Sequence, residues 1–174
     1  MNVLDSTDFI PLLANNEIDI SFTLDVPIYN FSINTALMID ETICAFSIPE
    51  HPLAQKAKVT IEDFLNIPLI LTGQNCCYRK MFEKDLLNAS ITPKIVLETS
   101  SLQVIKQTVL SGLGICVLPQ LSVQKELDNN ELVKLNYATN YKLASQVIYH
   151  KNKWISQNLK DFIDTVRAKT LVHN

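Results

Sequence analysis

Short apolar segments alternate with segments of helical periodicity along nearly the whole chain, and this alternation restricts the fold more than any other feature. Apolar runs at 67–71, 95–97 and 115–118 have the length of strands. After each run, apolar side chains recur every three or four residues, as on one face of a helix. Strands that alternate with helices form parallel sheets with crossover helices. The sequence therefore predicts an α/β fold.

The elements expected outside these units are shorter and less regular. A helix over 9–13 precedes a strand at 18–22. We also expect extended segments at 42–48, 132–135 and 146–149, short helices at 61–65 and 121–127, and a final amphipathic helix after Ser156. Thr60 and Asp63 have the spacing of a capping pair at the start of the 61–65 helix.

Composition is that of an ordinary globular protein. Hydrophobic residues make up 47% of the 174 residues, which is enough for a sizeable core. The net charge is -3 and no basic stripe is present, so direct nucleic-acid binding by this chain is not expected. No apolar run approaches the roughly 20 residues that span a bilayer, and the start MNVLDSTDF lacks a secretory pattern. We therefore expect a cytoplasmic protein without membrane contact.

Four cysteines occur in the chain, and no disulfide framework is expected because a chain of this size does not need one. Cys44 and Cys116 lie in apolar strand patterns, where cysteine behaves as a small buried hydrophobe. Cys76 and Cys77 begin a helical segment just before Arg79. A helix start and a nearby cation both favour the thiolate, so Cys77 is a candidate redox residue.

Patterns typical of enzymes, metal sites and nucleotide cofactors are missing. The three histidines are scattered and lack zinc-ligand spacing. Gly112-Leu113-Gly114 follows a helix instead of a strand, and Val117 stands where a dinucleotide fingerprint needs a third glycine. No Gly-x-Ser-x-Gly motif is present. We expect no cofactor, no metal and no enzymatic activity.

Three polar loops lie where parallel strands are expected to end, at 5–7, 72–77 and 98–101. Helix N-termini at such loops present backbone N–H groups, and hydroxyl and amide side chains add further partners for a carboxylate. Ser6 and Ser100 could instead only cap helices, whereas four successive polar or small residues at 72–75 exceed what capping requires. The candidate ligand-binding residues are Ser6, Thr23, Thr72, Gly73, Gln74, Asn75, Thr99 and Ser100.

Five segments, in this order and spacing, carry a family resemblance. They are NEIDI at 16–20, EHPLA at 50–54, VLSGLGI at 109–115, LP at 118–119 and EL at 126–127. Each segment alone is weakly specific, but together they cover nearly the whole chain. The chain resembles the effector-binding domain of LysR-type transcriptional regulators.

The resemblance implies two Rossmann-like lobes joined by two crossing strands, as in periplasmic binding proteins, with a small-molecule site in the cleft. The first lobe would comprise 1–45 and 147–174 and the second 46–146, with crossings near 44–47 and 147–149. Ser6 and residues 72–75 fall on positions that contact the effector in the family. The implied module binds a small anionic effector, forms a homodimer or tetramer, and changes its lobe arrangement so that the full regulator holds DNA differently.

This chain departs from the family pattern at its front. The winged helix-turn-helix, the linker helix, and the first strand and helix of the effector domain are absent, so we expect a fragment or truncated gene product whose DNA contact is made only by the absent domain.

Two alternative functions stay open. A solute-binding protein of a transport system would share the hinged fold. Peroxide-sensing relatives carry a reactive cysteine at the position of Cys77, although Leu86 replaces their resolving cysteine.

Overall fold

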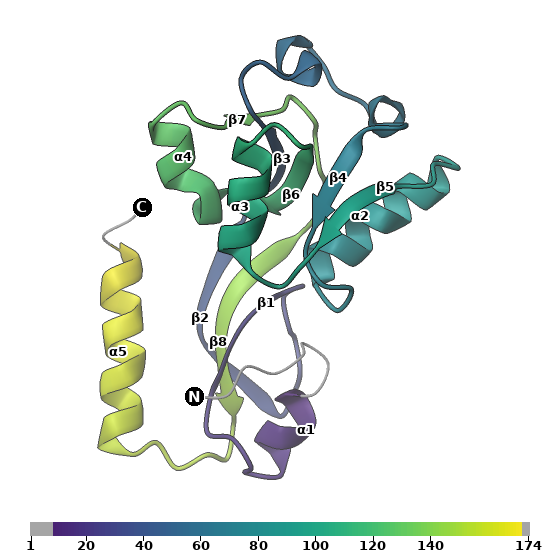
Figure 1. The fold of residues 1–174 in the computed structure, drawn as a ribbon. Coiled ribbons are helices and arrows are strands. Elements are labelled where there is room, and N and C mark those ends of the chain that lie inside the picture. The colour runs from purple at the N-terminus through teal and green to yellow at the C-terminus, as the bar shows by residue number, and fades with distance from the viewer. Residues whose placement is uncertain (1–8, 172–174) are drawn as a thin grey trace. The chain divides into compact units, whose positions relative to one another are not determined.

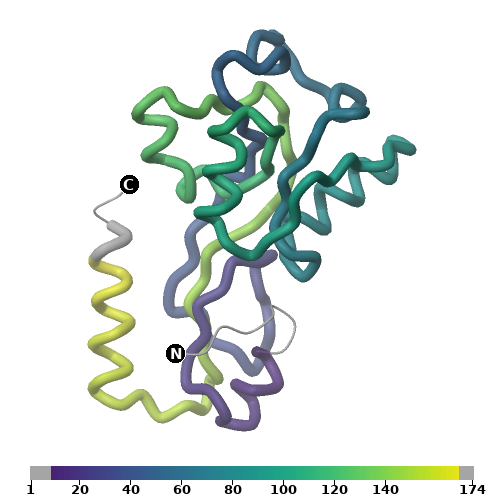
Figure 2. Tube along the Cα trace, in the orientation of Figure 1, coloured from purple at the N-terminus to yellow at the C-terminus, as the bar shows by residue number. Residues whose placement is uncertain are grey.

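The computed structural model describes residues 9–171, which form two compact units. Within the described residues, the first unit combines 9–40 with 142–171, and the second is Glu41–Tyr141. In Figure 2 the first unit therefore contains both the purple and the yellow parts of the tube, and the second contains the blue and green middle of the chain. The α/β class predicted from the sequence is confirmed.

The second unit is built on a five-stranded sheet with the order β5-β4-β6-β3-β7 (Figure 1). β4 is parallel to both β5 and β6, while β3 runs antiparallel to β6 and β7. The central strands are buried and apolar along their length, as expected for parallel strands covered on both faces. The strands are β3 (Ile43–Ser47), β4 (Pro68–Leu71), β5 (Lys94–Glu98), β6 (Ile115–Pro119) and β7 (Val133–Lys134).

The helices of the second unit are α2 (Cys77–Asn88), α3 (Leu102–Leu110) and α4 (Gln124–Asp128), with 3₁₀ turns at Pro52–Gln55, Ile61–Phe64 and Gln120–Val123. The 61–65 helix is thus a single 3₁₀ turn, and the helix expected at 121–127 is a 3₁₀ turn followed by the short α4. The capping pair is confirmed, because the Asp63 carboxylate accepts from the Thr60 N–H at 3.0 Å. Under this turn, Phe64, Phe82 and Tyr137 pack edge to face in the core.

The first unit contains a three-stranded sheet with the order β1-β8-β2. Its elements are α1 (Phe9–Ala14), β1 (Ser21–Asp25), β2 (Ile33–Glu41), β8 (Leu143–His150) and α5 (Gln157–Leu171). β1 and β8 are antiparallel, and Ser21 faces Ile148 in the register. One core cluster gathers Phe9, Leu13 and Ile148, and a second gathers Ala36, Val147 and Ile163.

The strand expected at 18–22 begins later, at Ser21. The N–H groups of Glu17 and Ile18 both donate to the carbonyl of Leu12, at 2.9 and 3.3 Å, and Asn16 adopts a left-handed φ of 58°. These bonds hold the backbone in the turn that ends α1, so strand pairing cannot start there. β2 was not expected from the sequence at all, because its burial does not alternate regularly along the strand.

The chain passes from the first unit to the second at 40–41 and returns at 141–142. The expected crossing segments, 44–47 and 147–149, lie within β3 and β8. β3 pairs with β6 from Ile43 to Phe46, which places it in the sheet of the second unit. Among the described residues, no helix is both long enough and apolar enough to cross a membrane.

Candidate functional site

Two of the three polar loops meet at one edge of the sheet of the second unit. β4 and β5 are parallel neighbours, so their carboxyl ends lie together and the loops 72–75 and 98–101 are adjacent. The Thr99 N–H donates to the carbonyl of Leu71 at 3.2 Å, which holds the start of loop 98–101 against the end of β4. The structure therefore brings two of the three predicted loops together, and loop 5–7 lies outside the described residues.

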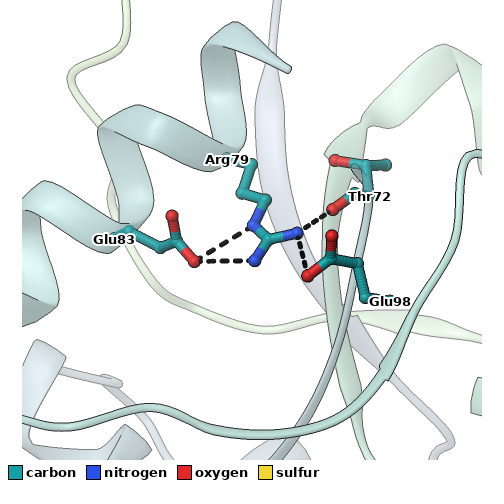
Figure 3. Close-up of polar contacts among 4 residues, drawn as sticks. All are labelled: Thr72, Arg79, Glu83 and Glu98. Carbon is teal, nitrogen blue, oxygen red and sulfur yellow. Dashed lines mark hydrogen bonds and ion pairs between the residues drawn. The ribbon is translucent and has the colours of Figure 1, made fainter. Parts of the chain in front are cut away.

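Arg79 in the first turn of α2 ties the two loops together (Figure 3). Its Nη1 donates to Oε2 of Glu98 at 2.9 Å and also to the carbonyl oxygen of Thr72. Its Nε and Nη2 both donate to Oε1 of Glu83, each at 3.0 Å. Glu83 therefore holds one side of the guanidinium, while Thr72 and Glu98 hold the other.

The Arg79 side chain is buried, with only 3% of the residue exposed. Burial alone would lower the pKa of Arg79, but hydrogen bonds and charge interactions with Glu83 and Glu98 outweigh it and raise that pKa above its ordinary value. The guanidinium stays charged, and its bonding capacity is largely used inside the protein. Arg79 therefore positions the two loops.

Thr72 ends β4 with a buried hydroxyl. The residue is 6% exposed, and its Oγ1 has no hydrogen-bond partner of regular geometry among the described residues, although it lies near the Cys76 thiol and the Tyr78 hydroxyl. A buried hydroxyl without a partner costs free energy of folding. Because this oxygen is buried, a ligand could bond it only if neighbouring atoms moved aside.

The other residues of loop 72–75 are partly or fully exposed. The Gly73 carbonyl accepts from the Cys76 N–H at 3.0 Å, which closes a turn before α2. A side chain at Gly73 would meet no atom within 4 Å, so there is open space beside the loop. Gln74 and Asn75 are exposed on this turn.

Loop 98–101 contributes two hydroxyls to the fold and leaves one exposed. Ser101 is the cap of α3, since its Oγ accepts from the Val104 N–H at 3.4 Å, and Thr99 Oγ1 accepts from the Ser101 N–H at 3.2 Å. The helix cap is thus Ser101 and not Ser100. Ser100 is exposed and its hydroxyl makes no hydrogen bond within the described part of the chain.

Cys76, the cap residue of α2, has the perturbed thiol of this region. A hydrogen bond from Cys77 is the largest cause, and it outweighs burial and lowers the pKa of Cys76 to about 6, with smaller contributions from Thr72, Tyr78 and the backbone of Arg79. Burial raises the pKa of Cys116 to about 12 and also raises the pKa of Cys44, as expected for buried structural thiols. The sequence pointed to Cys77, but the lowered thiol pKa is that of its neighbour Cys76.

The remaining predicted residues lie elsewhere. Thr23 is in the first unit, within β1, opposite the buried Gln146. Ser6 lies outside the described residues. The first unit also has a hollow of about 640 Å³ beside the β8–α5 connection, whose lining includes Lys153, Trp154 and Phe162. Glu98 belongs to the predicted loop 98–101 but was not among the candidate binding residues, and Glu83 was not predicted at all, because only their contact with Arg79 shows their importance.

Comparison with known proteins gives the family. The model of the LysR substrate binding domain matches residues 1–170. The chain belongs to the LysR substrate-binding domain family. The resemblance drawn from the sequence is thereby confirmed, and the match supports a transcriptional regulator domain rather than a transport solute-binding protein or a redox sensor acting through Cys77.

Curated relatives are transcriptional regulators that are longer than this LysR domain. The uncharacterized HTH-type transcriptional regulator YwqM of Bacillus subtilis is 35% identical over 155 residues, which cover 89% of this chain and 53% of that protein. The HTH-type transcriptional activator CmpR of Synechocystis is 30% identical over 158 residues, covering 90% of this chain and 51% of that protein. The chain thus spans about half the length of these relatives.

Solved LysR regulatory domains share the fold. The regulatory domain of Synechocystis CcmR in complex with 2-PG superposes with a TM-score of 0.76 at 22% identity, covering 97% of this chain and 81% of that one. The effector-binding domain of QuiR in complex with shikimate gives 0.66 at 20% identity, covering 92% of this chain and 76% of that one. This LysR domain therefore has the periplasmic-binding-protein-like fold of those domains.

Proposed function

We propose that this LysR domain binds a small metabolite with an anionic group at loops 72–75 and 98–101 and is the non-catalytic sensing part of a cytoplasmic transcriptional regulator. The supporting observation is the buried Thr72 hydroxyl, which has no hydrogen-bond partner of regular geometry among the described residues, at the point where the two loops meet. A hydrogen-bonding ligand would remove the cost of that unpaired group. Gln74 and Ser100 are exposed polar residues on the same two loops.

Helix ends add to the site. α2 and α3 both begin at these loops, and the first N–H groups of a helix have no acceptor within it. Such ends favour an anionic group such as a carboxylate. The two comparison domains were solved with 2-PG and shikimate, which are small molecules. In a longer protein carrying a helix-turn-helix, ligand binding would shift the population of conformations that hold DNA.

We also propose that this LysR domain forms a homodimer or a larger assembly through the face made by β5 and α3. β5 is an edge strand, so one side of its backbone has no strand partner among the described residues. A hollow of about 520 Å³ lies there, lined by Pro68, Val96, Leu97, Thr108 and Leu113. Val96 and Leu113 are 48% and 60% exposed, as expected of apolar side chains that a second copy would cover.

A thermal-shift screen of the purified chain against organic acids, amino acids and cofactors tests the placement of the site. Compounds that raise the melting temperature are titrated again on Gln74→Ala and on Gln107→Ala, which removes an exposed glutamine from α3 as a matched control. We expect the Gln74 variant to bind at least several-fold more weakly and the control to bind normally. Equal binding by both variants would contradict the proposed site.

A further inference from the structure

The charge at the two loops does not match a ligand that is only an anion. Residues 72–78 and 95–105 contain no lysine, arginine or histidine. Of the cations that flank these segments, Lys80 and Lys94 are exposed and Lys106 is paired with Glu126 at 2.7 Å. Arg79 is bonded to two carboxylates, so the Arg79, Glu83 and Glu98 cluster carries one excess negative charge. With 3% of Arg79 exposed, a ligand cannot reach this guanidinium without displacing its internal partners.

The Glu98 carboxylate is the negatively charged group of this cluster that lies at loop 98–101 and that a ligand could reach. Its side chain is 39% exposed, at the end of β5 where loop 98–101 begins. One carboxylate oxygen is bonded to Arg79, and the other has no hydrogen-bond partner among the described residues. Figure 3 shows Thr72 and Glu98 on the same side of the guanidinium, opposite Glu83. An acidic oxygen and an unsatisfied hydroxyl therefore lie beside the same loops.

We propose that the ligand carries an ammonium group that binds Glu98 as well as an acidic group that binds the loop hydroxyls and helix ends, so that its chemical class is an amino acid or a similar zwitterion. This inference rests on the proposed function and assigns the ligand class of the same site. The ammonium group would neutralise the excess charge through a charge-assisted hydrogen bond. The acidic group would meet Thr72 and the start of the twelve-residue helix α2.

A purely anionic ligand that displaced Glu98 fits the geometry less well. It would have to replace the bond of Glu98 to a buried guanidinium while leaving the Glu98 carboxylate without a partner next to it. Taking a carboxylate away from a buried guanidinium is costly. Glu98 is therefore the residue that selects ligands with a positive group, and Arg79 positions it.

Calorimetric titration of the full chain with matched ligand pairs tests the inference. The probes are the protein amino acids and the 2-hydroxy acids with the same side chains, which keep the carboxylate and lack the ammonium group. We expect the best amino acid to bind at least about tenfold more tightly than its hydroxy acid. In Glu98→Gln this preference should fall to near unity through weaker binding of the amino acid.

Glu83→Gln is the matched control. It also removes one negative charge that is paired with the Arg79 guanidinium, but on the side away from Thr72. It should keep the preference for the amino acid, whereas an effect of general unfolding would appear in both variants and in their melting curves. Equal binding of both ligand series, or an unchanged preference in Glu98→Gln, would overturn the inference. Hydroxy acids that bind as tightly as the amino acids, with an affinity that Gln74→Ala lowers, would overturn it while leaving the proposed site intact. If neither series binds, the inference is overturned, and the wider screen decides the site.

Discussion

The Thr72 hydroxyl at the end of β4 should destabilise the fold and strengthen ligand binding. Its buried hydroxyl lacks a hydrogen-bond partner among the described residues, so replacing it with a methyl group should relieve a cost of folding. We expect Thr72→Val to raise the free energy of unfolding by about 1 kcal/mol, measured by urea denaturation. The same variant should bind the ligand more weakly.

Thr139→Val is the contrasting variant for that measurement. The Thr139 hydroxyl donates to the carbonyl of Ile43 at 2.6 Å, so its loss should lower the free energy of unfolding by about 1 kcal/mol. Ligand affinity should not change. A Thr72→Val protein destabilised as much as Thr139→Val would show that the Thr72 hydroxyl is satisfied in the fold.

Cys76 gives a pH-dependent prediction. Because the pKa of its thiol is lowered from 9.0 to about 6, alkylation by iodoacetamide should reach half its maximal rate near pH 6, well below an ordinary cysteine. A pKa lower in the folded than in the unfolded chain stabilises the fold above the unfolded value, and this contribution is lost as pH falls from about 9 to 6. Cys76→Ser should lose both the early alkylation step and this pH dependence. Half-maximal alkylation near pH 8.5 would contradict the lowered pKa.

Some residues of the candidate site could be predicted from the sequence, and others could not. The 72–75 loop was found because its polar run follows an apolar strand, which is a local pattern. Arg79 and Glu98 are 19 positions apart in the sequence, and their pairing depends on β4 and β5 being neighbours in the sheet. No local pattern carries that information, so the charge balance of the site could not be predicted.

Among the elements, the parallel pair β4 and β6 depends on a close backbone approach. A methyl group at Gly114 would overlap the carbonyl group of Pro68, whereas one at Gly73 would meet nothing within 4 Å. We expect Gly114→Ala to lower the free energy of unfolding by about 2 kcal/mol, and Gly73→Ala to change it by less than about 0.5 kcal/mol. Chemical denaturation of both variants measures this, and equal stability would argue against the close approach.

Elements with strong periodicity were predicted well, and irregular ones were not. α3 and α5 follow apolar positions at helical spacing, and both were expected at these places. β2 was missed because it lacks regular alternation, and its short apolar run at 36–39 is mostly Ala, Leu and Met, which favour helices. The segment 61–64 forms only one 3₁₀ turn, since its length leaves no room for more.

At the scale of the whole molecule, association through β5 and α3 can be tested with charge substitutions. Val96→Glu and Leu113→Glu place carboxylates on exposed positions, which should leave folding intact and disrupt a self-associating face. Sedimentation velocity should then show a shift toward monomer. Leu121→Glu, at an equally exposed site on another turn, should keep the wild-type distribution. If all three variants sediment like the wild type, this face is not the interface.

Hydrogen–deuterium exchange of the chain, with and without the tightest compound from the screen, locates the bound ligand. We predict that added protection concentrates in the amides of residues 72–79 and 98–101, where helix ends and hydroxyls would hold the ligand. Protection confined instead to residues 16–20 and 153–162, around the hollow beside Trp154, would contradict it.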